Sequence, residues 1–415
     1  MKRISLLLVA LVGCLQTYGQ SYYEYYNRGR DKQRRGDLEG AIADFDKSVA
    51  IHTNYSASYY ERGEAKRKMG DLDGAILDFK RVIDLKPKDA FAYDGLGMAY
   101  QSRSNLDEAM ICYSKAIELR SGYAEAYGNR GCLFSDKGDY DDALKDLNKA
   151  IELAPQLGSL FFNRGNVNIA KGAFDAAIND YSEAIRLDPH DPLPRANRAL
   201  ARVNKEDFDG AIADYSELIR LKPNDPQGYL DRALAKRDKG NLDGAIGDFS
   251  NAIRLDSKSA EVFSFRAYNY YNLGQLTNSA NDFRKALELG SRDQDYPRFR
   301  LWLIEVQSRG NEVVSKELRE YLVERNTDRP DDWPVQVGRF LIGDLDQEAL
   351  LKAASDSDKN RDNEKHCEAW FYAGEKLRLA GDPTNAAQCF ERCVKTSVKN
   401  FEEYKSAISL LNYLK

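Results

Sequence analysis

The residues near the C-terminus whose types could do chemistry are one histidine and three cysteines: His366, Cys367, Cys389 and Cys393. Thiolate and imidazole groups are common zinc ligands, so this group could hold a metal ion. Its spacing matches no zinc signature, and Cys389 and Cys393 lie four positions apart on one face of an expected helix, which favours packing in a core. Alternatively, Cys367 and Cys393 could form a disulfide if the chain is exported to an oxidising compartment. We predict no metal site and leave the disulfide open.

Catalytic machinery is not indicated elsewhere in the sequence. The three histidines, His52, His190 and His366, are widely separated, and no glycine-rich phosphate loop, nucleophile elbow or zinc-protease motif is present. The charges are interspersed and sum to −5, so the chain lacks the basic stripe on which nucleic-acid binding depends. We predict that the protein is not an enzyme, uses no cofactor and does not bind nucleic acid.

Arginine and aspartate recur together at a fixed spacing of sixteen residues. The pairs are Arg28 with Asp44, Arg62 with Asp78, Arg130 with Asp146, Arg164 with Asp180, Arg198 with Asp214, Arg232 with Asp248, and Arg266 with Asp282. The equivalent places in one further unit hold Leu96 and Cys112, so the two charges are absent together. We predict partly buried ion pairs that hold two antiparallel helices together and are therefore architectural. The alternative is a set of exposed pairs, each worth about 0–1 kcal/mol.

Such pairs must be positioned by a repeated element, and glycines 34 residues apart mark its period: Gly29, Gly63, Gly97, Gly131 and Gly165. Alanine continues the register, which gives eight units over residues 22–291. In the fourth unit two amphipathic stretches are separated by Gly138 and closed by Pro155. With aromatic residues, glycine and alanine at fixed places, the units resemble tetratricopeptide repeats. The resemblance implies an all-α fold, a right-handed superhelical α-solenoid of eight helix pairs.

In tetratricopeptide arrays the first helix of each repeat lines a concave groove, with positions 2, 5, 6, 9, 12 and 13 facing into it. The groove residues predicted from this resemblance are Tyr23, Tyr26, Asn27, Arg30, Tyr60, Arg67, Asn129, Phe162, Asn163, Asn166 and Asn197. The asparagines at position 6 of three consecutive repeats resemble the asparagine ladder of O-linked N-acetylglucosamine transferases. An amide side chain offers donors and an acceptor, so it can hold the backbone of an extended peptide. The plainer alternative is that asparagine at an exposed helical position only adds solubility.

The N-terminal segment, residues 1–19, has the layout of a secretory signal. A basic start is followed by an apolar run over residues 4–13 that is too short to span a bilayer. The run ends in Leu-Val-Gly-Cys, which resembles the bacterial lipobox and implies a lipid on Cys14. The alternative is cleavage after Gly19, which would release a soluble periplasmic or secreted protein. We predict an exported protein, anchored to the outer membrane through this lipid.

The C-terminal region, residues 292–415, leaves the strict register but remains helical in pattern. Residues 367–400 restore the repeat pattern as a ninth unit, and residues 401–414 are expected to form a capping helix. A short helix, a turn at Gly343 and another helix are expected before them.

This tail, together with the lipobox and the repeats, is similar to the NlpI family of bacterial outer-membrane lipoproteins. That resemblance implies an adaptor at the cell envelope that docks proteases and cell-wall hydrolases, often as a homodimer. The predicted function is a non-catalytic scaffold that binds other proteins or extended peptides. The alternative is an accessory subunit of an outer-membrane pilus or secretion assembly.

Overall fold

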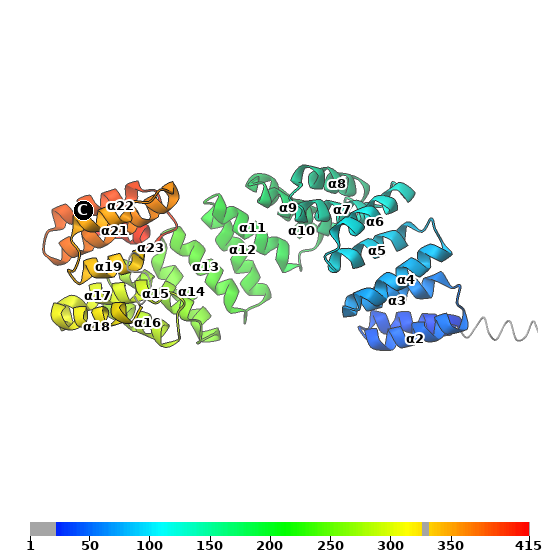
Figure 1. Ribbon diagram of the computed structural model, residues 1–415, viewed down its shortest axis with the longest axis horizontal. Coiled ribbons are helices and arrows are strands. Elements are labelled where there is room, and N and C mark those ends of the chain that lie inside the picture. Colours follow the sequence, from blue (N-terminus) through cyan, green and yellow to red (C-terminus); the bar gives the residue numbers. More distant parts are fainter. Residues whose placement is uncertain (1–21, 326–331, 415) are drawn as a thin grey trace, which may run out of the picture. The chain divides into compact units, whose positions relative to one another are not determined.

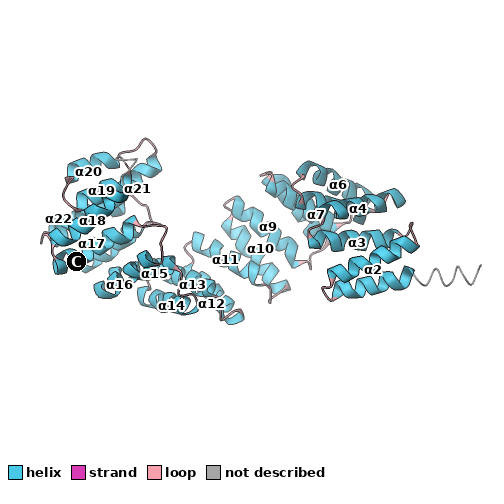
Figure 2. Ribbon diagram, turned by 60° about the horizontal axis from the view of Figure 1, so that its bottom comes forward, coloured by secondary structure: helices cyan, strands magenta, loops and turns pink. Residues whose placement is uncertain are grey.

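The computed structural model describes residues 22–325 and 332–414. Throughout these residues the regular elements are α-helices, with no strand among them (Figure 1, Figure 2). The predicted all-α solenoid of consecutive helix pairs is therefore confirmed. The signal segment at 1–19, including Cys14, lies outside the described residues. No helix within the described ranges combines the length and the apolar character needed to cross a bilayer.

Each 34-residue repeat contributes two helices that follow one another in the chain and are separated by a tight turn. In order, the helices of the eight repeats are residues 22–34 and α2 (Leu38–Ile51); α3 (Ser56–Met69) and α4 (Leu72–Leu85); α5 (Ala90–Ser102) and α6 (Leu106–Leu119); α7 (Ala124–Asp136) and α8 (Tyr140–Leu153); α9 (Gly158–Ala170) and α10 (Phe174–Leu187); α11 (Pro192–Asn204) and α12 (Phe208–Leu221); α13 (Pro226–Asp238) and α14 (Leu242–Leu255); α15 (Ala260–Asn272) and α16 (Leu276–Glu288).

Two compact units divide the chain, one ending at Lys205 and the other beginning at Glu206. The division falls inside the sixth repeat, between α11 and α12, although the 34-residue register continues without interruption through it. Arg198 and Asp214 therefore belong to different units.

Local sequence signals set the turn inside a repeat. In the second repeat α3 ends at Gly70, whose φ of 86° lies in the left-handed region that favours glycine. Asp71 then caps α4, since its carboxylate accepts a hydrogen bond from the backbone N–H of Gly74 at 3.0 Å. The chain reverses within a few residues, which brings the two helices of the repeat side by side.

Small residues allow the two helices of a repeat to approach closely. A Cβ atom added to Gly165 would lie 2.6 Å from the Tyr181 ring, so a larger residue would force the helices apart. Gly374 meets Phe390 in the same way, again at 2.6 Å. The helix pair predicted near the C-terminus is therefore packed like the strict repeats.

The second unit continues beyond the eighth repeat with α17 (Asp295–Arg309), α18 (Asn311–Arg325), α19 (Trp333–Leu341), α20 (Gln347–Ala354), α21 (Lys359–Leu379), α22 (Pro383–Lys395) and α23 (Glu402–Leu414). α19 and α20 flank the turn predicted at Gly343. α21 and α22 cover the ninth repeat predicted at 367–400, although α21 starts already at Lys359, and α23 covers the predicted capping helix. An aromatic core that includes Phe299, Trp302 and Phe371 joins these helices.

Candidate interaction surface

The first helices of the repeats form one layer in the first unit. α3 contacts α5, α5 contacts α7, α7 contacts α9, and α9 contacts α11, while α3, α5, α7 and α9 each also pack on the second helix of their own repeat (Figure 1). We call the side chains at positions 2, 5, 6, 9, 12 and 13 of these helices the inner face. All the predicted groove residues belong to the inner face of the first unit.

At the N-terminal end the inner face carries exposed tyrosine and arginine. Tyr23 is 50% exposed, and Asn27 and Arg30 are also exposed. Tyr26, which was predicted to face the groove, is instead buried against Phe45 and Tyr55, with ring centroids 6.2 and 5.3 Å away. The wide, flat tyrosine ring fills the gap between two repeats, so Tyr26 contributes to packing more than to an open surface.

Further along, two of the predicted residues are tied to neighbours. The half-buried Tyr60 packs edge-on against Phe79 at 5.6 Å, and Arg67 pairs with Glu64 at 2.9 Å on the same helix. Phe162 is half-buried against the ring of Tyr181.

The asparagines of the inner face hydrogen bond partly to one another and to adjacent repeats. The Asn129 amide donates to Asp94 at 3.0 Å, and the Asn197 amide donates to the Asn166 carbonyl oxygen at 3.0 Å. The Tyr181 hydroxyl also donates to Asn166, at 2.8 Å. Each of these amides keeps only part of its hydrogen-bonding capacity for a ligand. Asn163 is half-buried.

Asp94 is an inner-face residue that the sequence comparison did not single out. Its side chain is 3% exposed and accepts hydrogen bonds from the Tyr123 hydroxyl at 3.1 Å and from Asn129. Burial raises its pKa to about 6 against these two hydrogen bonds, and the negative charges of Glu125 and Glu64 raise it further. The available signal was an aspartate at position 5 of the third repeat, where the other strict repeats have tyrosine, glycine, phenylalanine, alanine, leucine or serine.

Six of the arginine–aspartate pairs form charge-assisted hydrogen bonds between the two helices of a repeat: Arg28–Asp44, Arg62–Asp78, Arg130–Asp146, Arg164–Asp180, Arg232–Asp248 and Arg266–Asp282. The Arg130 guanidinium, for example, donates to both oxygens of Asp146, at 2.6 and 3.0 Å. That aspartate is 5% exposed. Hydrogen bonds from Arg28 lower the pKa of Asp44 to about 2. The aspartates of all six pairs are buried, and five of the arginines are at most 24% exposed, whereas Arg28 is 53% exposed. The pairs therefore lie between the two helices of a repeat and away from the inner face.

From the second repeat onward, the arginines at this position also contact the preceding repeat. The second guanidinium nitrogen donates to a side-chain oxygen at position 25 of that repeat, in the pairs Arg62–Asp46, Arg130–Ser114, Arg164–Asn148, Arg198–Ser182, Arg232–Ser216 and Arg266–Ser250. Before the exceptional third repeat this position is Lys80, a cation that could not accept such a bond. Where Leu96 replaces the arginine, both of the arginine's usual partners are replaced as well: the aspartate by Cys112 and the acceptor in the preceding repeat by Lys80.

A second contact between repeats also escaped the sequence comparison. A basic residue at position 14 pairs with an aspartate at position 18 of the preceding repeat, in the pairs Arg103–Asp73, Lys137–Asp107, Lys171–Asp141, Lys205–Asp175 and Lys239–Asp209. The signal was present as two charged columns in the aligned repeats. Because these pairs are largely exposed, each contributes at most about 1 kcal/mol.

In the second unit the C-terminal region covers the inner face of the eighth repeat. Tyr268 and Tyr271 are 6% and 4% exposed, and the Tyr271 hydroxyl donates to Glu375 of α21 at 2.8 Å. Arg237 on α13 donates to Glu402 of α23 at 2.8 Å. The sequence implied a groove lined by the first helices of all eight repeats. This is corrected for the eighth, because α21 and α23 fill it.

A buried polar cluster lies behind this cover. Arg300 is fully buried, donates to Glu403 at 3.1 Å, and places its guanidinium 4.2 Å from the centre of the Phe371 ring. Glu368 accepts hydrogen bonds from Tyr296 and from the Trp333 indole, both at 2.6 Å. These residues connect α17, α19, α21 and α23, which gives the cluster a structural role.

The cysteines of the described residues are free thiols. Cys367 and Cys393 are fully buried, and their sulfur atoms lie 3.4 Å apart on α21 and α22. A disulfide between them therefore remains a prediction. No cluster of histidine, cysteine and carboxylate side chains suited to a metal ion occurs in the part of the chain that the structure describes.

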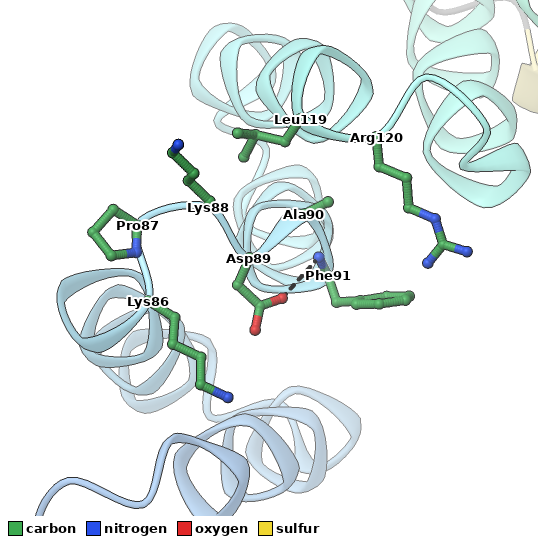
Figure 3. A pocket seen from close by; sticks show the side chains of 8 residues that line it. All are labelled: Lys86, Pro87, Lys88, Asp89, Ala90, Phe91, Leu119 and Arg120. Carbon is green, nitrogen blue, oxygen red and sulfur yellow. Dashed lines mark hydrogen bonds between the residues drawn. The ribbon is translucent and has the colours of Figure 1, made fainter.

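An open pocket of about 750 Å³ lies beside the start of α5 (Figure 3). It is lined by Lys86, Pro87, Lys88, Asp89, Ala90, Phe91, Leu119 and Arg120. The Phe91 ring lies 5.1 Å from the Arg120 guanidinium carbon and 5.0 Å from the Tyr123 ring. Asp89 caps α5 by accepting from the Phe91 backbone N–H. The pocket adds an aromatic and basic rim to the inner face.

Comparisons with known families agree with the repeat architecture. Models described as tetratricopeptide repeat match residues 56–89, 92–123, 124–157, 197–260 and 260–289, and a model described as TPR repeat matches residues 165–205. No curated protein matches the sequence.

Among solved structures, the C-terminal part of a TPR repeat-containing protein from Cytophaga hutchinsonii is 18% identical; the match covers 58% of this chain and 99% of that one, with a TM-score of 0.52. PilF of Pseudomonas aeruginosa is 20% identical over 51% of this chain and 96% of that one, with a TM-score of 0.45. YrrB, described as a TPR protein with an unusual peptide-binding site, is 23% identical over 43% of this chain and 92% of that one, with a TM-score of 0.39. At these identities the likeness concerns the fold.

Proposed function

Since this chain is a tetratricopeptide repeat protein, we propose that it is a non-catalytic adaptor that holds other proteins or extended peptides on the inner face of its first unit. Proteins built from such repeats are generally protein-interaction scaffolds. Within the first unit the inner face keeps exposed side chains such as those of Tyr23, Asn27 and Arg30, in contrast to the covered tyrosines of the eighth repeat.

The observation that carries this proposal is the exposure of large side chains at inner-face positions. Tyr23 and Phe91 are 50% and 44% exposed, whereas the other aromatic side chains described in the repeats are buried or half-buried. Tyrosine is enriched among the residues that contribute most to binding energy at protein interfaces. Exposed apolar surface also favours binding, because a partner that covers it removes it from water. The buried arginine–aspartate pairs, by contrast, are already used within the array.

A pull-down from envelope extract tests the surface with a matched control. The double variant Tyr23→Ala, Phe91→Ala removes exposed side chains from the inner face, and we expect it to lose proteins that the unaltered chain retains. The control is Leu77→Ala, Ile111→Ala on the second helices α4 and α6, where the side chains are 68% and 69% exposed. Loss of the partner with the control and its retention with the inner-face variant would refute the proposal.

The identity of the retained protein then separates two roles. Recovery of proteases or cell-wall hydrolases supports an envelope adaptor, as the similarity to NlpI-type lipoproteins suggests. Recovery of one subunit at fixed stoichiometry supports the alternative, an accessory component of a pilus or secretion assembly.

We also propose that the protein is exported and anchored to the outer membrane through Cys14. A basic start, a short apolar run and the Leu-Val-Gly-Cys sequence support this location. Cells fed a radioactive fatty acid are expected to label the protein, and Cys14→Ala is expected to abolish the label. An unlabelled mature protein that begins at Gln20 would instead establish the soluble form.

A further inference from the structure

We infer that the inner face of repeats 2–4 recognises a lysine or arginine side chain of its partner, and that Asp94 is the residue that selects it. This inference rests on the proposed function, because it specifies the chemistry of the ligand. The juxtaposition that carries it is a buried carboxylate that bonds no cation among the described residues, with the Tyr123 ring between it and the exposed ring of Phe91.

Asp94 is an unusual carboxylate for this chain. The buried aspartates of the arginine-containing repeats described above each contact a guanidinium, whereas Asp94 contacts only the uncharged Tyr123 hydroxyl and Asn129 amide among the described residues. A buried carboxylate without a cation is costly, because hydrogen bonds from neutral groups replace only part of its lost hydration. The fold therefore maintains a negative charge here at a cost that, among the described residues, these two neutral hydrogen bonds offset only in part.

The charges around Asp94 reinforce this negative character. Glu64 on α3 and Glu125 on α7 are both close enough to raise its pKa. Glu64 is partly compensated by Arg67, but Glu125 is exposed and has no side-chain partner within the described residues. Tyr60 from α3 and Tyr113 from α6 complete the surroundings, and the Asp94 charge raises the pKa of each phenol after burial, the larger cause. The charges that act on Asp94 itself are therefore negative, while the basic side chain of Arg120 lies over the neighbouring Tyr123 ring.

The occupant that fits is a basic side chain rather than a free metal ion. Carboxylates suited to coordinating a metal do not cluster here, and the described residues hold no such group. Aromatic rings lie close by instead: Tyr123 contacts both Asp94 and the exposed ring of Phe91. The guanidinium of Arg120 lies over both rings, 5.1 Å from the centre of Phe91 and 5.6 Å from that of Tyr123, so these rings already accept one basic side chain. Lysine and arginine have an apolar stem and a charged end, so they can pack against such rings while the end reaches a carboxylate.

A single substitution, Asp94→Asn, is expected to weaken peptide binding without lowering the stability of the protein. Asp94→Asn keeps the size of the side chain and can still accept from Asn129, while the Tyr123 hydroxyl can turn to accept from the new amide. Because a desolvated charge is removed, the melting temperature is expected to be unchanged or higher. Binding of a basic peptide is expected to weaken by roughly tenfold or more, since a buried charge pair is lost.

The experiment selects random peptides displayed on phage against the immobilised full chain, in parallel for the unaltered protein, Asp94→Asn and Asp136→Asn. Asp136 is an exposed inner-face carboxylate and serves as the matched control. We expect lysine or arginine to be enriched at one peptide position by the unaltered protein and by Asp136→Asn, but not by Asp94→Asn.

The outcomes distinguish the role of Asp94 from the proposed binding of peptides on the inner face. Selected peptides without a basic residue, or basic peptides that bind Asp94→Asn equally well, overturn the role of Asp94 and leave the binding function in place. If the inner face of the unaltered protein selects no peptide, the proposed function and this inference both fail. A clear fall in the melting temperature of Asp94→Asn also overturns it, because Asp94 would then be a structural residue.

Discussion

Replacing Arg130 alone with leucine is expected to destabilise the first unit by about 3–5 kcal/mol, because it leaves Asp146 buried without its cation. Asp146 is 5% exposed, and the hydrogen bonds described for its carboxylate come from Arg130. The substitution also removes the bond from Arg130 to Ser114 of the preceding repeat. Thermal and urea unfolding of the full chain, followed by hydrogen exchange at α7 and α8, would measure the loss.

The third repeat provides the matched control for this experiment. It holds Leu96 and Cys112 where the fourth repeat holds Arg130 and Asp146. The double variant Arg130→Leu, Asp146→Cys copies that arrangement, so we expect it to recover most of the lost stability. Arg34→Ala breaks an exposed pair with Asp31 and should cost no more than about 1 kcal/mol. If Arg130→Leu matches Arg34→Ala, the buried pair has no special importance.

The fold could be predicted because the same contact between two helices recurs in each repeat of the sequence. Each recurrence of glycine opposite an aromatic residue, such as Gly165 and Tyr181, repeats one helix-to-helix contact, so the period alone specifies the pair. Comparison of columns within one repeat also paired each arginine with its aspartate. Contacts between repeats were missed because they join different columns of neighbouring repeats, as Arg130 and Ser114 do.

The site was harder to predict than the fold because binding residues do not recur. Aspartate stands at position 5 in the third repeat alone, so a comparison of the repeats with one another does not single out Asp94. The burial of Tyr268 and Tyr271 depends on where α21 and α23 pack, and these helices follow a stretch in which the register is lost. A pattern of residues along one helix does not specify which distant helix will cover it.

Stability of the second unit is expected to fall as the pH rises from about 4.3 to about 8, because of Glu368. Burial, together with the charge of Glu403, raises the pKa of Glu368 to about 8 despite its hydrogen bonds from Tyr296 and Trp333. In an unfolded chain glutamate titrates near pH 4.3, so within this window the unfolded state has released a proton that the folded state retains. Each pH unit in the window therefore favours unfolding by at most about 1.4 kcal/mol. Thermal unfolding of the second unit across this range measures the slope.

Glu368→Gln separates charge from hydrogen bonding at this site. The amide oxygen of glutamine can accept from Tyr296 and Trp333 as the carboxylate does, but it carries no charge to desolvate beside Glu403. We expect the variant to lose the pH dependence and to be more stable than the unaltered protein at pH 8, by an amount on the order of a few kcal/mol. Glu368→Leu also removes the charge but leaves two buried donors without an acceptor, at about 1–3 kcal/mol each, so it should be less stable than the glutamine variant at every pH. A glutamine variant that is less stable than the unaltered protein at pH 8 would show that Glu368 is ionised in the folded unit, and that its charge supports the packing of α17, α19 and α21.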